Sequence, residues 1–244
     1  MRGILVLSRE KDLIPKNFKK SMPLLIRLFL NIMPSNKGDG LSESLQSLGP
    51  TWIKMGQFLS TRPDIIGNKL SKHLRELQDS IPPFDQRFVE EALIESFGKD
   101  FKKKFKKIEE PIAAASIAQV HKALIDVDGV SKTVALKVLR PNIESKIKRD
   151  LKDFYLAAKI LEKLSSEARR LRVIDVVRTL EESLSMEIDL RLEAAAQSEI
   201  IENTQEDKFI EIPEVFWDLT SKNILTTEWA VSYTHLTLPT MLWV

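Results

Sequence analysis

The chain has 244 residues, which is enough for one large or two small domains. Hydrophobic residues make up 43% of it and charged residues 30%, a mixture that indicates a packed core under a well-solvated surface. The net charge of +2 gives no sign of the concentrated basic excess of nucleic-acid-binding proteins, so no nucleic-acid partner is expected. The absence of cysteine excludes disulfides, thiolate zinc sites and thiol nucleophiles, and it suits a reducing compartment.

The first 40 residues predict an amphipathic segment followed by a linker. Residues 15–34 combine lysines and an arginine with leucines and a phenylalanine, which fits a helix lying on a membrane surface or a helix docked on its own domain. The sequence KGDG at 37–40 indicates the linker. We recognise no secretory signal, and no segment has the roughly 20 consecutive apolar residues that a bilayer span requires.

Helical patterns fill residues 41–110. The stretch LSESLQSLGPTWIKMGQFLSTRPD has a helical pattern with a break at Gly49-Pro50, where the proline can begin a new helix. Two amphipathic patterns follow: NKLSKHLRELQDSIPPF, which the Pro82-Pro83 pair ends, and QRFVEEALIESFG, which Gly98 is expected to cap. The basic run KDFKKKFKK is expected to be a solvated helix end rather than a patch for phosphate or anionic lipid.

Strand patterns begin after residue 110. The stretch AAASIAQVHKA predicts a loop of small residues that runs into a strand, and VALKVLRP predicts a second strand beyond a turn near Asp128-Gly129. A long helical tract is predicted over residues 142–204 with a break near Arg172, and further strands are predicted in FIEIPEVFWDL and NILTTEW. Helices segregated from a small antiparallel sheet make the fold class α+β.

The end of the chain differs in composition from the rest. Residues 231–244, VSYTHLTLPTMLWV, contain no Asp, Glu, Lys or Arg. The part VSYTHLTLPT resembles a translated sequencing-adapter tail. We therefore expect residues 231–244 to be a non-native tail, foreign to the gene.

A lysine interrupts the aliphatic run of the second strand. Lys137 is flanked by Ala135, Leu136, Val138 and Leu139, which indicates a buried strand, where an unpaired ammonium group would be strongly destabilising. We therefore expect a carboxylate partner; the alternative is a lysine at a strand edge with its charge in water. Protein kinases bind ATP phosphates with two strands and an embedded lysine, but they carry G-x-G-x-x-G where this chain has alanines.

Four motifs in order carry a resemblance to a known family. They are LGPTWIKMGQFLSTRPDIIG, PIAAASIAQVHKA, VALKVLRP and EIDLRLEAA, and they lie within about residues 41–230. Together they resemble the UbiB/ABC1 family of atypical protein-kinase-like proteins, also called ADCK, and most of all its bacterial UbiB members. The resemblance implies a kinase-like N-lobe at 111–230, with a small antiparallel sheet and αC-type helices, after an N-terminal helical extension at 41–110.

The resemblance also implies where a nucleotide would bind. An alanine-rich loop, Ala113, Ala114, Ala115 and Ser116, stands where kinases carry the glycine-rich loop, and Glu228 at the end of NILTTEWA would lie at the hinge that contacts adenine. Glycine reaches positive φ freely and lets backbone N–H groups close over a phosphate, whereas the Cβ of alanine disfavours those conformations. We therefore expect the grip of this loop on the phosphates to differ from that of a kinase.

The same resemblance implies catalytic roles for acids in MEIDLRLEAA. Glu193 would pair with Lys137, and Glu187 and Asp189 would form the E-x-D motif of the family. On one continuous helix Glu187 and Asp189 would point about 200° apart, so both could face one metal ion only if the helix begins between them or bends. We therefore favour Glu187 over Asp189 for the site.

Lys54 and Gln57 match the K-x-G-Q signature of the family. They lie three residues apart and project together from a helix, while Gly56 between them permits the close approach of another backbone. In the family this helix lies across the nucleotide cleft, so Lys54 would meet acids such as Glu187. A peptide groove closed in this way argues against ordinary protein phosphorylation. A solvent-exposed lysine on an amphipathic helix is the simpler alternative.

The sequence after Lys137 contains no H-x-D or D-F-G motif, which in kinases supply the catalytic base and the Mg²⁺ ligands. We therefore expect the C-lobe to be absent and the chain by itself to be an inactive fragment. His73, His121 and His235 lack metal-ligand spacing, so no metal site is expected, and His121 is interpreted as structural.

The resemblance implies that the full-length protein is an ATP-binding atypical kinase or ATPase that supports ubiquinone biosynthesis, using ATP or ADP with Mg²⁺. The alternative is a nucleotide-gated scaffold or lipid-handling pseudokinase without essential phosphotransfer. A hydroxylase, as the family has also been named, is disfavoured because we find no flavin or haem motif. Expected partners are nucleotide and either the membrane surface or quinone-biosynthesis proteins and lipids, and the expected location is cytoplasmic, peripheral to the bacterial inner membrane.

Overall fold

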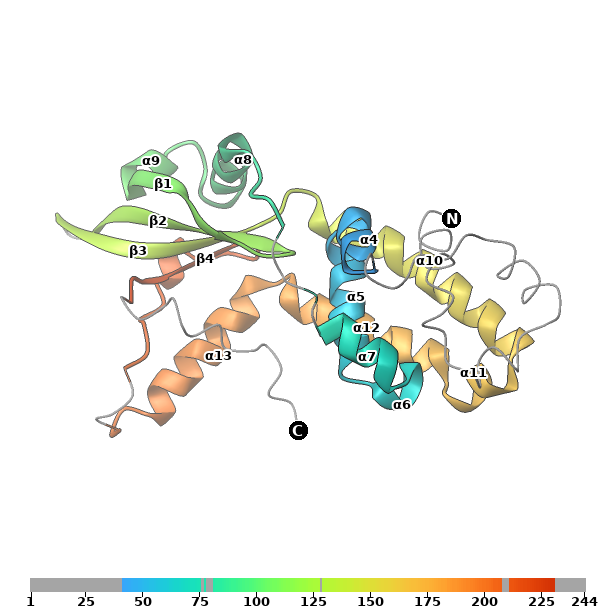
Figure 1. Ribbon diagram of the computed structural model, residues 1–244. Helices are drawn as coiled ribbons and strands as arrows, with labels where there is room; N and C mark the ends of the chain where they lie inside the picture. The colour runs from blue at the N-terminus through green and yellow to red at the C-terminus, as the bar shows by residue number, and fades with distance from the viewer. Residues whose placement is uncertain (1–40, 76, 78–80, 128, 208–210, 231–244) are drawn as a thin grey trace. The chain divides into compact units, whose positions relative to one another are not determined.

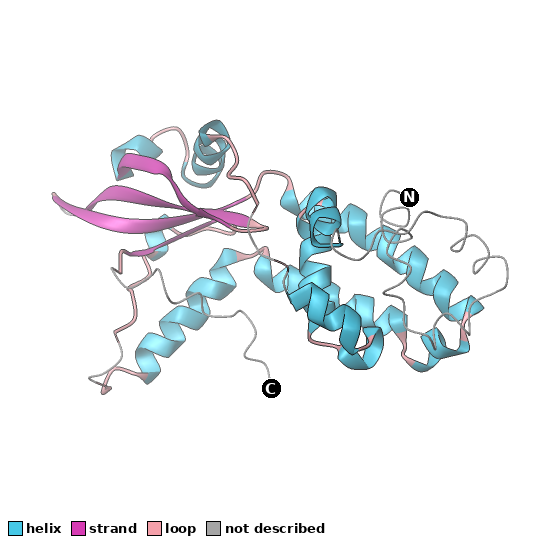
Figure 2. Cartoon of the chain, in the orientation of Figure 1, coloured by secondary structure: helices cyan, strands magenta, loops and turns pink. Residues whose placement is uncertain are grey.

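The computed structural model describes residues 41–75, 77, 81–127, 129–207 and 211–230 (Figure 1). They form helices and a four-stranded antiparallel sheet, which confirms the predicted α+β class (Figure 2). The chain divides into two compact units, the first comprising Met1–Ile81 and Asn142–Ser185, the second Pro82–Pro141 and Met186–Val244. The predicted amphipathic segment, the linker at 37–40 and the predicted tail at 231–244 lie outside the described residues.

The first unit is helical. Its helices are α4 (Leu41–Leu48), α5 (Pro50–Ser60), α6 (Pro63–Ile66), α7 (Asn68–Arg75), α10 (Ile143–Leu164), α11 (Ser166–Arg170) and α12 (Val173–Glu187), the last of which ends in the second unit. Gly49, at a φ of 104°, and Pro50, at the start of α5, separate the first two helices as predicted. None of the described helices is both long and apolar enough to cross a membrane.

Helix α5, which carries the K-x-G-Q motif, packs closely within this unit. A Cβ added at Gly56 would lie 2.4 Å from Cδ1 of Leu77 and 3.1 Å from Cδ1 of Leu45. The close approach predicted at Gly56 is therefore made by two leucine side chains and not by a backbone. On another part of α5, Trp52 packs edge-on against Phe154 of α10, with 4.7 Å between the ring centroids.

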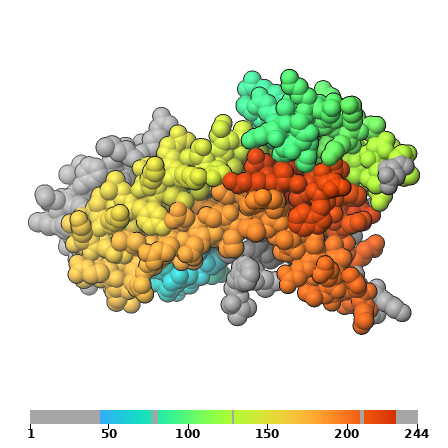
Figure 3. Space-filling model, turned by 180° about the vertical axis from the view of Figure 1, so that it is seen from behind, coloured from blue at the N-terminus to red at the C-terminus, as the bar shows by residue number. Residues whose placement is uncertain are grey.

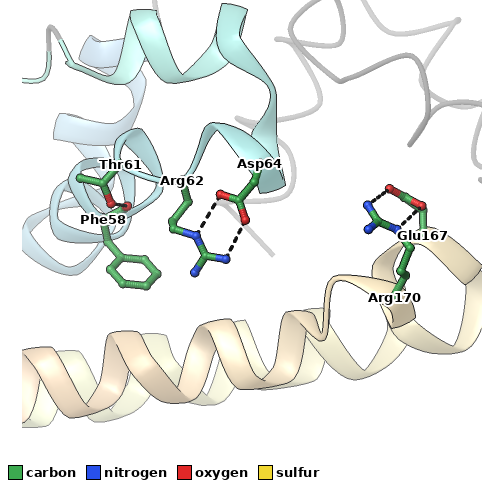
Figure 4. Close-up of polar contacts among 6 residues, drawn as sticks. All are labelled: Phe58, Thr61, Arg62, Asp64, Glu167 and Arg170. Atoms are coloured by element: carbon green, nitrogen blue, oxygen red, sulfur yellow. Dashed lines mark hydrogen bonds and ion pairs between the residues drawn. The ribbon is translucent and has the colours of Figure 1, made fainter. Parts of the chain in front are cut away.

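Local polar contacts fix the turns of the first unit (Figure 4). Arg62 donates from Nε and Nη2 to the two carboxylate oxygens of Asp64 at 3.0 and 2.8 Å, and these hydrogen bonds lower the pKa of Asp64. The hydroxyl of Thr61 donates to the carbonyl of Phe58 at 2.8 Å where α5 ends. Because exposed ion pairs contribute little to stability, these contacts define the geometry of the turn rather than hold the unit together.

The second unit contains the sheet. Its elements are α8 (Gln86–Phe97), α9 (Phe101–Lys104), β1 (Phe105–Ala114), β2 (Ala118–Val127), β3 (Val130–Leu139), α13 (Leu190–Asn203), the 3₁₀ turn η2 (Trp217–Leu219) and β4 (Ile224–Glu228). The strand order is β1-β2-β3-β4, and every neighbouring pair is antiparallel. Helices α8 and α9 cover one face of the sheet and α13 lies on the other side (Figure 1). From behind, the red residues of the β4 region lie between the green strands and the orange α13 (Figure 3).

The two faces of β3 differ in chemistry, as its alternating pattern requires. Val134, Leu136 and Val138 are fully buried and form a core with residues of α8 such as Val89 and Leu93. The turn predicted between β2 and β3 is present, since Val127 pairs with Val130, and Gly129 has the positive φ of 82° that suits glycine. Within β3 the odd-numbered residues, Lys137 among them, therefore face the side of the sheet away from α8.

Two parts of the secondary structure differ from the prediction. Strand β1 occupies residues that were expected to be the end of a helix and a loop. The strand predicted in FIEIPEVFWDL is wrong for the described residues: 211–214 have no regular structure, Val215 makes a single bridge to Thr227, and η2 follows. Pro213 lacks the N–H that a strand would use, and its carbonyl accepts from the side chain of Gln197.

We expect Leu136→Ala to lower the free energy of unfolding by about 2–5 kcal/mol, because it empties a fully buried position in the sheet core. Val130→Ala is the matched control, since Val130 lies on the same strand but is 61% exposed. We expect it to change stability by less than about 0.5 kcal/mol. Urea unfolding followed by circular dichroism measures both variants, and equal effects would contradict the assigned core.

Candidate functional site

Lys137 lies in the middle of the sheet and pairs with a carboxylate. In the register of the sheet it stands opposite Val120 of β2 and Leu225 of β4. Its Nζ donates to Oε1 of Glu193 at 2.8 Å and to Oε2 at 2.7 Å, so the expected pairing is present. The two side chains are 27% and 37% exposed, which leaves the pair accessible from solvent.

The start of α13 positions Glu193 in its first turn. Asp189 caps the helix, because its Oδ1 accepts from the backbone N–H of Arg191 at 3.2 Å. The N–H of Leu190 donates to the carbonyl of Lys222 at 3.0 Å, which ties the same turn to the residues before β4. A carboxylate is also favourable near a helix N-terminus, so Glu193 suits its place in the first turn of α13.

The two acids of the E-x-D motif lie on either side of a helix break. Glu187 is the last residue of α12, and Asp189 precedes α13, so they do not share one continuous helix. This is one of the two geometries that could let both acids face one ion. Arg191, however, donates from Nε and Nη2 to Asp189 at 2.9 and 2.6 Å, and these hydrogen bonds lower the pKa of Asp189. Asp189 thus has a structural partner and a capping role.

The alanine-rich segment is a tight strand-to-strand turn. Ala113 and Ala114 are the last residues of β1, and the N–H of Ala115 donates to the carbonyl of Ala118 at 2.8 Å. Ser116 is fully buried. The residues with positive φ in the described chain do not include any of residues 113–116. The turn therefore uses backbone conformations that alanine adopts without strain, and it does not need glycine.

A buried polar group supports this turn from the core side of the sheet. Gln119 accepts from the N–H of Phe84 at 2.9 Å, and its Nε2 lies 2.9 Å from Nε2 of His121. Nδ1 of His121 lies 2.7 Å from the carbonyl oxygen of Glu109, which can only accept. Nδ1 therefore carries the proton, and Nε2 accepts from the amide of Gln119. Burial lowers the pKa of His121, and the neutral ring is a structural element, as interpreted from the sequence.

The structure does not test the predicted roles of Lys54, Gln57 and Glu228. Lys54 and Gln57 are half-buried on α5 of the first unit, and their place across a nucleotide cleft stays a prediction. Glu228 ends β4, where it is exposed and pairs with Val134, and its N–H donates to the carbonyl of Glu214 at 2.8 Å. Its contact with adenine also stays a prediction.

The face of the sheet around Lys137 fits a nucleotide better than a metal ion. Val120, Ala135 and Leu225 share that face, so a cation stands beside small and aliphatic side chains that could pack on a flat base. Within the described residues no three or more His, Cys, Asp or Glu side chains gather where they could hold a metal ion.

A small antiparallel sheet whose inner strand carries a lysine paired with a helix carboxylate defines the N-lobe of a protein-kinase-like fold. The model of the ABC1 atypical kinase-like domain matches residues 76–238, and the chain belongs to this family.

Curated relatives agree with this assignment. The chain is 37% identical over 223 residues to the "Probable protein kinase UbiB" of Vibrio cholerae, which covers 89% of this chain and 41% of the relative. The protein of the same name from Marinobacter nauticus is 36% identical over 216 residues, which cover 85% of this chain and 39% of the relative. The one from Pseudomonas aeruginosa is 37% identical over 193 residues, which cover 79% of this chain and 36% of the relative. The chain thus spans about two fifths of their length.

The sequence reasoning missed two residues that shape this site. Arg140, in the motif VALKVLRP, bonds the carbonyl of Ala115, and Gln119 bonds the backbone of Phe84. Both side chains bond backbone atoms, and a pattern of residue types in the sequence does not predict such contacts. The capping role of Asp189 could have been found, because an aspartate just before an apolar helical pattern is a helix start signal.

We expect the stability of the protein to depend on pH through His121. Burial lowers the pKa of His121 in the folded state below its value of about 6.5 in the unfolded state. As the pH falls, His121 therefore takes up a proton in the unfolded state first. The contribution of the neutral His121 ring to the free energy of unfolding is present in full above about pH 6.5. Below that pH the free energy of unfolding falls by up to about 1.4 kcal/mol per pH unit.

Urea unfolding between pH 7.5 and 5.5 tests this dependence. We expect His121→Gln to flatten the slope and His73→Gln, on a half-exposed part of α7, to leave it unchanged. The same slope in His121→Gln as in the wild type would contradict the assignment.

Proposed function

We propose that this chain forms the nucleotide-binding N-lobe of an atypical kinase or ATPase that supports ubiquinone biosynthesis. The observation that carries the proposal is the contact of Lys137 with both oxygens of Glu193 on the face of the sheet away from the core. Membership of the ABC1 family and relatives named "Probable protein kinase UbiB" support the same class of activity. Ubiquinone biosynthesis enters from the resemblance to UbiB.

Lys137 would bind the nucleotide through its phosphates. An ammonium group has three donors, and Glu193 accepts two of them, which leaves one for an oxygen of the α- or β-phosphate. Glu193 holds the ammonium in place through both of its carboxylate oxygens. Because this cation is positioned before the nucleotide binds, little ordering of its long side chain remains to be done on binding.

The chain would bind and orient the nucleotide rather than transfer a phosphoryl group by itself. When bound, ATP would supply that phosphoryl group, and Mg²⁺ would neutralise part of the charge of its phosphates. The alanine-rich turn, residues 113–116, would lie over the phosphates without the positive φ angles that bring several N–H groups together. A larger share of phosphate binding would therefore fall to Lys137.

A second candidate function is a nucleotide-gated scaffold or lipid-handling pseudokinase without essential phosphotransfer. The observation that favours it is the bidentate contact between Asp189 and Arg191, which occupies one acid of the E-x-D motif. In both cases we propose a location at the bacterial inner membrane, with quinone-biosynthesis proteins or lipids as partners. This part of the proposal rests on the family resemblance.

The test of nucleotide binding is Lys137→Ala in the full-length product of the gene. Removing hydrogen bonds from a charged donor costs about 1.5–3 kcal/mol, so we expect ATP to bind about 10- to 150-fold more weakly by calorimetry. Lys132→Ala is the matched control, because Lys132 lies on the same strand with its ammonium over the ring of Phe216. Equal ATP affinity in wild type and Lys137→Ala would sink the proposal.

The same proteins separate the two candidate functions. The kinase or ATPase predicts Mg²⁺-dependent ATP hydrolysis that lipid or a quinone-precursor mimic stimulates and that Lys137→Ala abolishes. The scaffold predicts ATP binding that Lys137→Ala weakens, without hydrolysis above background under any of these conditions.

A further inference from the structure

Arg140 lies directly after β3 and fixes the alanine-rich turn. Its backbone N–H donates to the carbonyl of Ile117 at 2.8 Å. Its guanidinium donates from Nε and Nη2 to the carbonyl of Ala115 at 3.1 and 2.9 Å. Backbone and side chain of one residue thus hold two of the residues between β1 and β2. The turn cannot move away from the end of β3 without breaking these bonds.

The same guanidinium also contacts the segment where the chain first enters the second unit. We call residues 82–84 the strap, since the unit begins at Pro82. Nη2 of Arg140 donates to the carbonyl of Pro82 at 3.0 Å, and the guanidinium carbon lies 5.6 Å from the centroid of the Phe84 ring. Arg140 is therefore a bridge between the strap and the alanine-rich turn.

Gln119 makes a second connection between the strap and the sheet. Its Oε1 accepts from the N–H of Phe84 at 2.9 Å, and its Nε2 donates to the carbonyl of Phe84 at 3.3 Å. Gln119 is 1% exposed and stands on β2 immediately after the turn. The strap is thus bonded at Pro82 by Arg140 and at Phe84 by the buried amide of Gln119. Gln119 follows the turn in the sequence, and Arg140 bonds the turn from the end of β3.

A planar guanidinium suits this position in a way that an ammonium group does not. Its fixed fork can donate to two carbonyl oxygens and stack on a ring at once, whereas lysine offers a single point charge on a flexible stem. The contacts to Ala115, Pro82 and Phe84 use all of these properties. The substitution Arg140→Lys therefore keeps the positive charge but removes the bridge between the strap and the alanine-rich turn.

We infer that Arg140 is the positioning residue of the alanine-rich turn. By bonding the turn to the strap, it holds the turn where the phosphates of a bound nucleotide lie. The inference rests on the proposed nucleotide-binding function. Arg140 acts through backbone carbonyls and does not itself touch the nucleotide. In a kinase the glycine-rich loop gains its grip from conformational freedom, whereas here the turn is ordered in advance by contacts on its far side.

The test compares ATP with adenosine in the full-length protein carrying Arg140→Lys, by competition against a fluorescent ATP analogue. A turn that must be reordered on binding weakens contacts to phosphates, so we expect ATP to bind about five- to tenfold more weakly. Adenosine lacks the phosphates and should bind within about twofold of wild type. Arg87→Lys is the matched control, because Arg87 also stacks on a phenylalanine of this unit, at 4.5 Å from the ring of Phe88.

Hydrogen exchange of the turn gives a second readout that does not depend on nucleotide. We expect the amides of residues 115–118 to exchange at least about tenfold faster in Arg140→Lys, while those of β3 keep their protection. Unchanged exchange at 115–118 would overturn the positioning role, and so would equal losses for ATP and adenosine. Normal ATP binding in Arg140→Lys, with weak binding in Lys137→Ala, would overturn this inference alone. A wild-type protein that binds no ATP would overturn the proposed function and this inference with it.

Discussion

Lys137 stands on an inner strand, on the face of the sheet away from the core, where its half-buried ammonium group contacts a carboxylate. Glu193 supplies that match from a helix 56 residues further along the chain. The pair therefore constrains more than its own atoms. It requires α13 to begin beside the sheet, and Asp189 as a cap and Leu190 bonded to Lys222 hold the helix start in place. The candidate site is built around this one ion pair.

The alanine-rich turn is the second element of the site, and its backbone conformations are ones that residues other than glycine adopt. Without easy access to positive φ, residues 113–116 form a tight turn in ordinary backbone conformations. Such a turn cannot wrap around a phosphate by its own flexibility, and Arg140 holds it from outside instead. A phosphate on this sheet would meet a preformed cation and an ordered turn. This arrangement supports the proposed binding and orientation of a nucleotide by a kinase-like lobe without a glycine-rich loop.

Much of the second unit could be predicted because its signals are local. The β2–β3 hairpin shows alternating residues around Gly129, and the lysine in its aliphatic second strand indicated an acid partner, which the family resemblance assigned to Glu193. Strand β1 was missed because FKKIEEPIAA contains lysines, glutamates and a proline, and its pairing with β2 is interrupted by irregularities in register. Arg140 was missed because its partners are backbone carbonyls 25 and 58 residues away, a distance over which side-chain patterns carry no information.

The most direct test of the central claim is chemical labelling of the full-length protein with an acyl-phosphate derivative of ATP, which acylates lysines that lie beside bound phosphates. Peptide mass spectrometry then locates the label. The structure predicts modification of Lys137, protection by excess ATP, and little protection at surface lysines such as Lys132, whose side chain lies over Phe216. Labelling spread over surface lysines, with Lys137 unmodified or unprotected by ATP, would contradict a phosphate site on this face of the sheet.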